Sequence, residues 1–167
     1  MIIKVASLWQ PWAEAMRLKL KKNETRSWWT AYRGWLAIHA AKKRFNPNEY
    51  SPEFAHECRA RNFWPDTLTY GAVVCIVKLV GCENSERVRD VVSEAERFWG
   101  NYDDKRYIWI TCPDSMVELA EPIPLRGHQG LFNWDVPDEL AMRLRINYPS
   151  RFYDMKTLAF QNYRGTA

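Results

Sequence analysis

The stretch from Lys19 to Lys43 reads KLKKNETRSWWTAYRGWLAIHAAKK and combines positive charge, aromatic rings and short apolar runs. Successive side chains of a β-strand point to opposite faces, so a strand over residues 24–28 places Glu24, Arg26 and Trp28 on the same face. We therefore expect a carboxylate, a guanidinium and an indole to share one surface of a sheet.

Cations flank this strand and the next one. Lysines precede the first strand, and the second, an apolar run over residues 35–41, ends in Lys42 and Lys43. Positive charge holds phosphates and exposed indoles stack on nucleobases, so we expect Lys21, Lys42 and Lys43 to contact the phosphates of RNA or DNA. The structural alternative is an ordinary ion pair on a sheet, with the tryptophans filling a core.

The composition predicts one globular domain. A chain of 167 residues can bury a core without disulfides or metals. Nine Trp, eight Tyr and seven Phe make it unusually aromatic, which fits either a bulky barrel interior or a surface that stacks on flat ligands. We assign residues 1–148 to the domain and residues 149–167 to a peripheral tail.

Charge is unevenly distributed along the chain. Residues 1–44 carry ten Lys and Arg against two acids, a net charge of +8, whereas the remainder carries fourteen bases against eighteen acids, a net charge of −4. A basic amino-terminal third predicts a localised anionic partner, although a solvated basic face would give the same count.

Four cysteines show no C-x-x-C pair and no histidine at ligand spacing. We therefore expect reduced thiols, no metal, no cofactor and a cytoplasmic location. No segment resembles a signal peptide, and the longest apolar run, residues 72–80, is interrupted by Lys78, so we expect no contact with a membrane.

The hydrophobic pattern predicts an α+β fold in which a small mixed β-barrel carries helices. Gly100 is expected to end one helix in a left-handed conformation, and Pro113-Asp114 to form a turn between strands. The expected strands are residues 2–8, 24–28, 35–41 and 71–82, then 107–112, with one or two edge strands within 116–125. The expected helices begin at Pro11, Pro52, Asp90 and Asp138.

Three segments together resemble the ASCH family, a branch of the PUA-like superfamily of nucleic-acid-associated barrels. The family pattern G-x-K-x-x-E-x-R is similar to residues 19–26, where Lys21, Glu24 and Arg26 match and Lys19 replaces the glycine. Residues 7–13 (SLWQPWA), 33–43 and 127–134 (GHQGLFNW) are similar to the subgroup that contains the carboxy-terminal domain of activating signal cointegrator 1.

The resemblance implies a barrel of about five or six strands, a helix between the first two strands, and a cleft lined by the motif. It also implies binding of RNA or DNA, which we expect to involve a single or flipped-out nucleotide rather than a long duplex groove. Because Lys19 has a Cβ, we expect it to avoid the positive φ that a glycine could adopt there.

Within such a cleft, Arg26 could bind a base or phosphate, and Glu24 could accept a hydrogen bond from an exocyclic amine such as that of cytosine. A tryptophan could stack on a splayed base, and Gln129 could reach across from its glycine-flanked loop. The expected nucleic-acid-binding residues are Lys21, Glu24, Arg26, Trp9, Trp12, Trp28, Arg33, His39, Lys42, Lys43 and Gln129.

Some members of the family are hydrolases, which leaves an enzymatic alternative acting on an N4-acetylcytidine-type nucleoside or on a phosphodiester. Lys21 and Glu24 would then be a base with its electrostatic partner, and His39 a proton carrier. The related deacetylating members place a threonine nucleophile where Glu24 stands, which a carboxylate does not replace, so we assign no catalytic residue.

A third alternative is a protein-interaction module that uses the acidic later part of the chain. We expect a monomer.

Overall fold

A computed structural model describes residues 1–146 of the chain, and the tail at residues 149–167 lies outside them. The domain is α+β, with a six-stranded mixed sheet in the order β2-β5-β4-β3-β1-β6. The strands are β1 (Ile2–Leu8), β2 (Asn23–Arg26), β3 (Gly34–Ala40), β4 (Ala72–Asn84), β5 (Tyr107–Pro124) and β6 (Leu131–Asp135). The helices are α1 (Trp12–Arg17), the 3-10 turn η1 (Pro47–Glu49), α2 (Pro52–Ala60), α3 (Ser85–Val88), α4 (Glu94–Trp99) and α5 (Asp138–Ile146).

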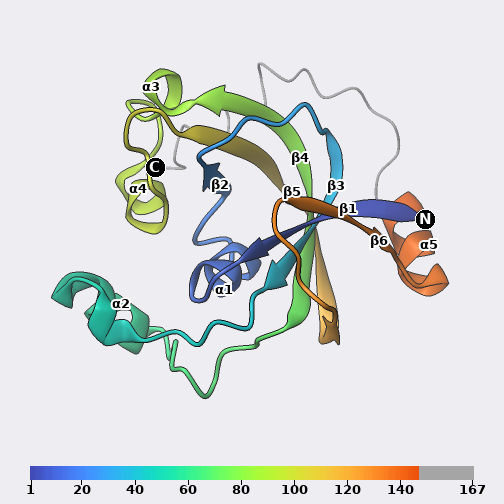
Figure 1. Cartoon of the computed structure of the whole chain (residues 1–167), viewed down its shortest axis with the longest axis horizontal. Coiled ribbons are helices and arrows are strands. Elements are labelled where there is room, and N and C mark those ends of the chain that lie inside the picture. Colours follow the sequence, from blue (N-terminus) through green and yellow to red (C-terminus); the bar gives the residue numbers. More distant parts are fainter. Residues whose placement is uncertain (147–167) are drawn as a thin grey trace.

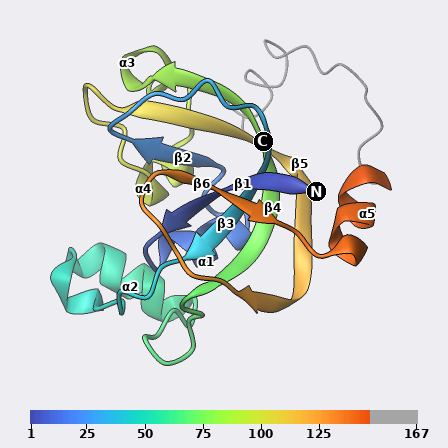
Figure 2. The ribbon, with the colours of Figure 1, turned by 45° about the vertical axis from the view of Figure 1, so that its right-hand side comes forward.

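The sheet curves into a small open barrel whose edges are β2 and β6 (Figure 1 and Figure 2). β1 and β3 pair in parallel and the other neighbours are antiparallel. Helix α1 lies between the first two strands along the chain. The predicted α+β class and the position of this helix are confirmed.

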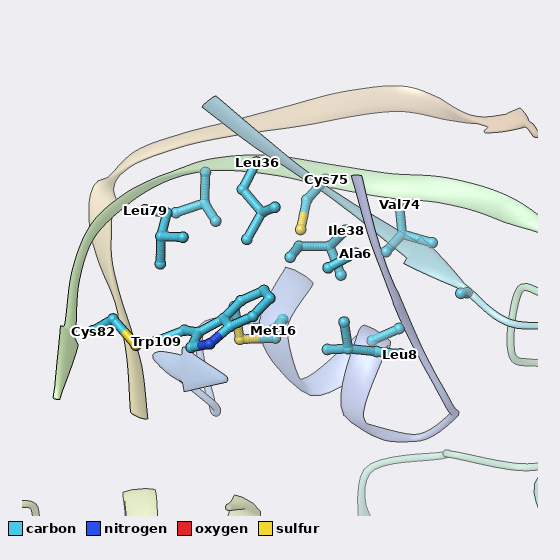
Figure 3. Close-up of a cluster of buried hydrophobic side chains, with 13 residues drawn as sticks. Ala6, Leu8, Met16, Leu36, Ile38, Val74, Cys75, Leu79, Cys82 and Trp109 are labelled. Atoms are coloured by element: carbon cyan, nitrogen blue, oxygen red, sulfur yellow. The ribbon is translucent and has the colours of Figure 1, made fainter. Parts of the chain in front are cut away.

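Two apolar clusters fill the two sides of the curved sheet. On β3, Leu36 and Ile38 belong to the cluster shown in Figure 3, together with Met16 of α1 and Trp109 of β5. Ala37, which points the other way, belongs to a second cluster that includes residues of β1 and α5. The period of two along β3 therefore separates the two cores.

Strand β5 runs unbroken through the place where we predicted a turn, so the expectation of separate strands there is wrong. Residues 113–116 form a bulge opposite β4, between the pairs Lys78–Cys112 and Ile76–Val117. In this bulge the Ser115 hydroxyl accepts the Lys78 backbone N–H at 2.8 Å and donates to the Cys112 carbonyl at 2.6 Å. Pro113 is tolerated because a bulge does not require its missing N–H.

The predicted helix from Asp90 to Trp99 is also partly wrong. The short α3 ends at Val88, before Asp90, and α4 begins only after Ser93, whose hydroxyl accepts the Glu96 backbone N–H and caps the helix. Gly100 has φ −133°, which is extended rather than left-handed. Glycine is needed there for space, since a Cβ would lie 2.6 Å from the Tyr102 ring.

Strand β2 ends at Arg26, so Trp28 does not lie on it as predicted. Trp28 follows in a bend, and its ring packs edge-on against Trp109 with the ring centroids 4.6 Å apart.

Helix α1 begins one residue later than predicted, with Pro11 as its N-cap. Among residues 1–146, none of the helices has the length and apolar character needed to cross a bilayer.

Lys19 adopts φ +59°, contrary to our expectation that it would avoid this region. The reason is the end of α1. The Lys19 N–H donates to the Met16 carbonyl at 3.0 Å and the Leu20 N–H donates to the Ala15 carbonyl at 2.9 Å. This pair of bonds is the Schellman motif, which requires a left-handed residue just after the helix. The two satisfied carbonyls hold Lys19 in a conformation that a glycine would adopt without steric cost.

We predict that Lys19→Gly stabilises the domain by about 0.5–1 kcal/mol, because glycine relieves the strain of positive φ at this position. The measurement is the free energy of unfolding from urea denaturation. The matched control is Leu18→Gly, one residue earlier, where φ is −86° and glycine should destabilise. An unchanged or lower stability for Lys19→Gly would contradict this interpretation.

Candidate functional site

A cleft of about 590 Å³ lies between the strand ends of β1 and β2 and the segments that carry α2 and α4. Both views place α2 and α4 on the side of the molecule away from α5 (Figure 1 and Figure 2). The motif residues form one part of its lining, and aromatic side chains from α1, α2, α4 and the residue after η1 form another. The segments that meet here are far apart in the sequence.

An ionic trio of Lys21, Glu24 and Arg26 lines the cleft. The Lys21 Nζ lies 3.4 Å from Oε2 of Glu24, and the Arg26 Nε lies 2.9 Å from Oε1. Each carboxylate oxygen therefore faces a different cation. The Lys21 side chain is 2% exposed and the Glu24 side chain 9%, whereas Arg26 is 24% exposed. The trio is a recessed site that a ligand reaches only by entering the cleft.

Arg26 also connects the edge strand β2 with β1, which are not neighbours in the sheet. Its Nη2 donates to the Ser7 carbonyl at 2.8 Å, at the end of β1 where β6 no longer pairs. The guanidinium carbon lies 5.7 Å from the centroid of the Trp109 ring, a cation–π contact. A guanidinium offers five N–H donors in a fixed plane, so Arg26 can hold Ser7 and still present donors to a ligand.

Helix α4 fixes the segment that enters β2. The buried Glu96 carboxylate accepts the backbone N–H of Lys22 at 2.7 Å, that of Asn23 at 2.9 Å, and the Tyr102 hydroxyl at 2.9 Å. The Thr111 hydroxyl donates to the Lys22 carbonyl from β5. Because Lys21 immediately precedes these anchored groups, Glu96 sets the position of the ionic trio relative to α4.

Aromatic rings form a second side of the cleft. Phe54 of α2 stacks on Trp12 with centroids 5.9 Å apart and an interplanar angle of 27°, and on Phe98 of α4 at 5.5 Å and 30°. Tyr50 packs edge-on against Trp12 at 5.5 Å. Phe98 remains 41% exposed. The cleft therefore offers a flat apolar surface as well as charged groups.

Trp9 carries a cation at its face. Lys43 Nζ lies 4.2 Å from the centroid of the Trp9 ring, and the residue is 54% exposed. An exposed indole beside a lysine is suited to stack on a base while the ammonium contacts a phosphate.

The structure brings together most of the residues that the sequence singled out. Six of them line the cleft, namely Lys21, Glu24, Arg26, Trp9, Trp12 and Trp28. Lys43 contacts Trp9. Arg33, His39, Lys42 and Gln129 do not line it. Arg33 donates to the carbonyls of Thr30 and Tyr32, Lys42 lies over Gly71, and Gln129 is exposed in the loop before β6.

His39 is buried on the opposite side of β3 from the Leu36 and Ile38 cluster. Its Nδ1 lies 3.0 Å from the Ser7 hydroxyl and its Nε2 lies 3.0 Å from the Leu125 carbonyl. A carbonyl only accepts, so Nε2 carries the proton and Nδ1 accepts from Ser7. Gly127 packs directly above, since a Cβ there would lie 2.6 Å from the imidazole. These contacts link β1, β3 and the end of β5.

Sequence reasoning missed Tyr50, Phe54, Phe98, Arg106 and Glu96. Their segments showed helix caps and aromatic residues, but nothing in their spacing indicated that they fold over the amino-terminal motif. Arg106 lines the cleft and donates to the Thr25 carbonyl at 3.1 Å, while its Nε is a buried donor with no hydrogen-bond partner among the described residues.

Two curated proteins are similar to most of this chain. No protein-family model matches the chain. Over 132 residues, 77% of this chain, it is 26% identical to mouse and to human proteins. The chain is similar to activating signal cointegrator 1. It spans 22% of the length of these relatives, so the similarity concerns one portion of activating signal cointegrator 1.

We predict that Glu96→Gln destabilises the domain by about 1–3 kcal/mol, because the amide can accept with only one of the two atoms that now accept from backbone N–H groups and Tyr102. Urea denaturation measures the loss. Glu94→Gln is the matched control, since Glu94 is exposed on the same helix. Equal stability of the two variants would show that the buried hydrogen bonds of Glu96 contribute nothing net.

His39 should make stability depend on pH. Burial lowers its pKa from the ordinary value of 6.5, the nearby His128 and Lys42 charges lower it further, and the Leu125 contact opposes them. Below pH 6.5 the unfolded chain therefore binds a proton that the folded chain does not, so stability falls as the pH drops from 6.5 toward the lowered pKa. We predict that the stability advantage of the wild type over His39→Gln shrinks between pH 7.5 and pH 5. A stability difference between the two proteins that stays constant over this pH range would contradict a lowered pKa for His39.

Proposed function

We propose that this chain is an ASCH-type, PUA-like domain that binds RNA or DNA by taking one unpaired nucleotide into the cleft. The observation that carries the proposal is the ionic trio of Lys21, Glu24 and Arg26 recessed beside exposed aromatic rings. Ion pairs buried this deeply contribute little to stability on balance, because desolvation offsets the attraction. Their donors and acceptors are available to a ligand that enters.

The size of the cleft supports a single nucleotide. Pockets of about 300–1,000 Å³ enclose small ligands, and the volume of about 590 Å³ lies within that range. A duplex presents its bases stacked inside a helix, so only an unpaired or flipped nucleotide can bring a base edge to a recessed trio.

The surroundings of the trio supply the other contacts that a nucleotide needs. Phe54 and Phe98 offer a stacking surface, and base stacking on such rings contributes about 1–3 kcal/mol per base. Arg106 lines the cleft and Lys43 contacts the Trp9 ring, so both are cations that can contact phosphates. The similarity to activating signal cointegrator 1 and the segments that resemble the ASCH family support the same assignment.

The experiment is a binding titration of labelled single-stranded RNA and DNA hexanucleotides, followed by fluorescence anisotropy at several salt concentrations. We predict that log K falls with log salt by about 0.7 for each phosphate contacted. Trp9→Ala should weaken binding by about 5- to 100-fold, which corresponds to one lost stacking contact.

Trp64→Ala is the matched control, because Trp64 is 40% exposed and does not line the cleft. It should leave the affinity unchanged. Binding that is independent of salt, or equal losses in both variants, would contradict a cleft that combines charge with stacking.

A further inference from the structure

The order of hydrogen-bonding groups in the ionic trio has a consequence for base identity. The Glu24 carboxylate lies between the Lys21 ammonium, at Oε2, and the Arg26 guanidinium, at Oε1. Ammonium and guanidinium groups only donate, and an ionised carboxylate only accepts. Across the trio, a ligand therefore meets a donor, an acceptor and a donor.

Each member of the trio has bonding capacity left. Lys21 has three N–H donors, and among residues 1–146 its ammonium contacts Glu24 alone. The two carboxylate oxygens of Glu24 can accept about four hydrogen bonds, and each faces one cation. Arg26 uses one Nη donor for Ser7 and keeps others. With Lys21 98% buried at its side chain, donors that a ligand leaves unpaired would be costly.

We propose that the cleft selects a base with an imide edge, uracil or thymine, an inference that rests on the proposed nucleotide-binding function. Their Watson–Crick edge presents O4, N3–H and O2, which is an acceptor, a donor and an acceptor. O4 accepts from Lys21, N3–H donates to Glu24, and O2 accepts from Arg26. All three groups of the trio are then paired.

The other bases leave a mismatch. Cytosine presents an amine and then two acceptors, so its N3 lone pair faces the Glu24 carboxylate in the same register, and a shifted register leaves one cation unpaired. Guanine can offer O6 to Lys21 and N1–H to Glu24, but its 2-amino group turns a donor toward Arg26. Adenine lacks a second acceptor on this edge. A site built to pair polar groups rejects ligands that leave them unpaired.

The test uses short single strands with an abasic sugar-phosphate backbone and one base at the centre, so that phosphate contacts stay constant. The central base is uracil, thymine, 3-methyluracil, cytosine, guanine or adenine, and a fully abasic strand reports the phosphate contribution. We predict similar affinity for uracil and thymine, and affinity at least about tenfold weaker for the other bases. The N-methyl group of 3-methyluracil removes only the donor that faces Glu24.

On the protein side, Lys21→Met removes one donor and leaves Glu24 paired with Arg26. It should weaken uracil-strand binding by about tenfold, with less effect on the cytosine strand. The matched control is Lys19→Met, the same change on an exposed lysine that does not line the cleft, and it should have no effect.

Equal binding of the uracil and 3-methyluracil strands would overturn the inference, as would a cytosine, guanine or adenine strand that binds as tightly as uracil. Equal binding of all strands, the abasic strand included, would also overturn it while leaving a phosphate-binding cleft intact. Absence of binding by every strand would remove the proposed function itself.

Discussion

The arrangement around one carboxylate organises this domain. Glu24 is almost fully buried, and its charge is tolerated because Lys21 and Arg26 each contact one of its oxygens. Removing one partner of a buried ion pair typically costs about 3–5 kcal/mol, since the remaining charge stays desolvated. Glu24 has two cationic partners, so its charge is compensated on both sides and the three side chains are held in a fixed order.

The rest of the fold supplies the surroundings that the trio requires. The Schellman turn after α1 directs the chain into Lys21, the Glu96 carboxylate fixes the backbone of Lys22 and Asn23, and Arg26 ties β2 to the end of β1. These contacts come from helices and strands distant in the sequence. Each one constrains the position of a charged side chain, so the geometry of the cleft is set before a ligand arrives.

Local patterns predicted much of this structure. The period of two in β2 placed Glu24 and Arg26 together, and the α5 boundary at Asp138 followed from its opening residues. Other features depended on tertiary contacts. The unbroken β5 relies on the Ser115 hydroxyl replacing a backbone acceptor for Lys78, and positive φ at Lys19 relies on helix-end hydrogen bonds that outweigh the steric penalty of a Cβ.

The candidate site likewise combines residues that the sequence predicted with residues that only tertiary contacts bring together. The motif and three tryptophans were recognisable in the sequence. The aromatic side of the cleft was not, because Phe54 and Phe98 meet only through the packing of α2 against α4. Burial also changes the role that we assign to Lys21. Lys21 appeared in the sequence as a surface phosphate contact, but its 2% exposure makes it a recessed donor.

Nucleotide binding at the ionic trio is tested most directly by mapping it residue by residue with nuclear magnetic resonance. The ¹H–¹⁵N spectrum, including side-chain indole and guanidinium signals, would be recorded during titration with a short single-stranded oligonucleotide. We predict that the largest shifts fall on Lys21, Glu24, Arg26 and the Trp9 indole. Shifts confined to the acidic surface of later segments, with these signals unmoved, would contradict it.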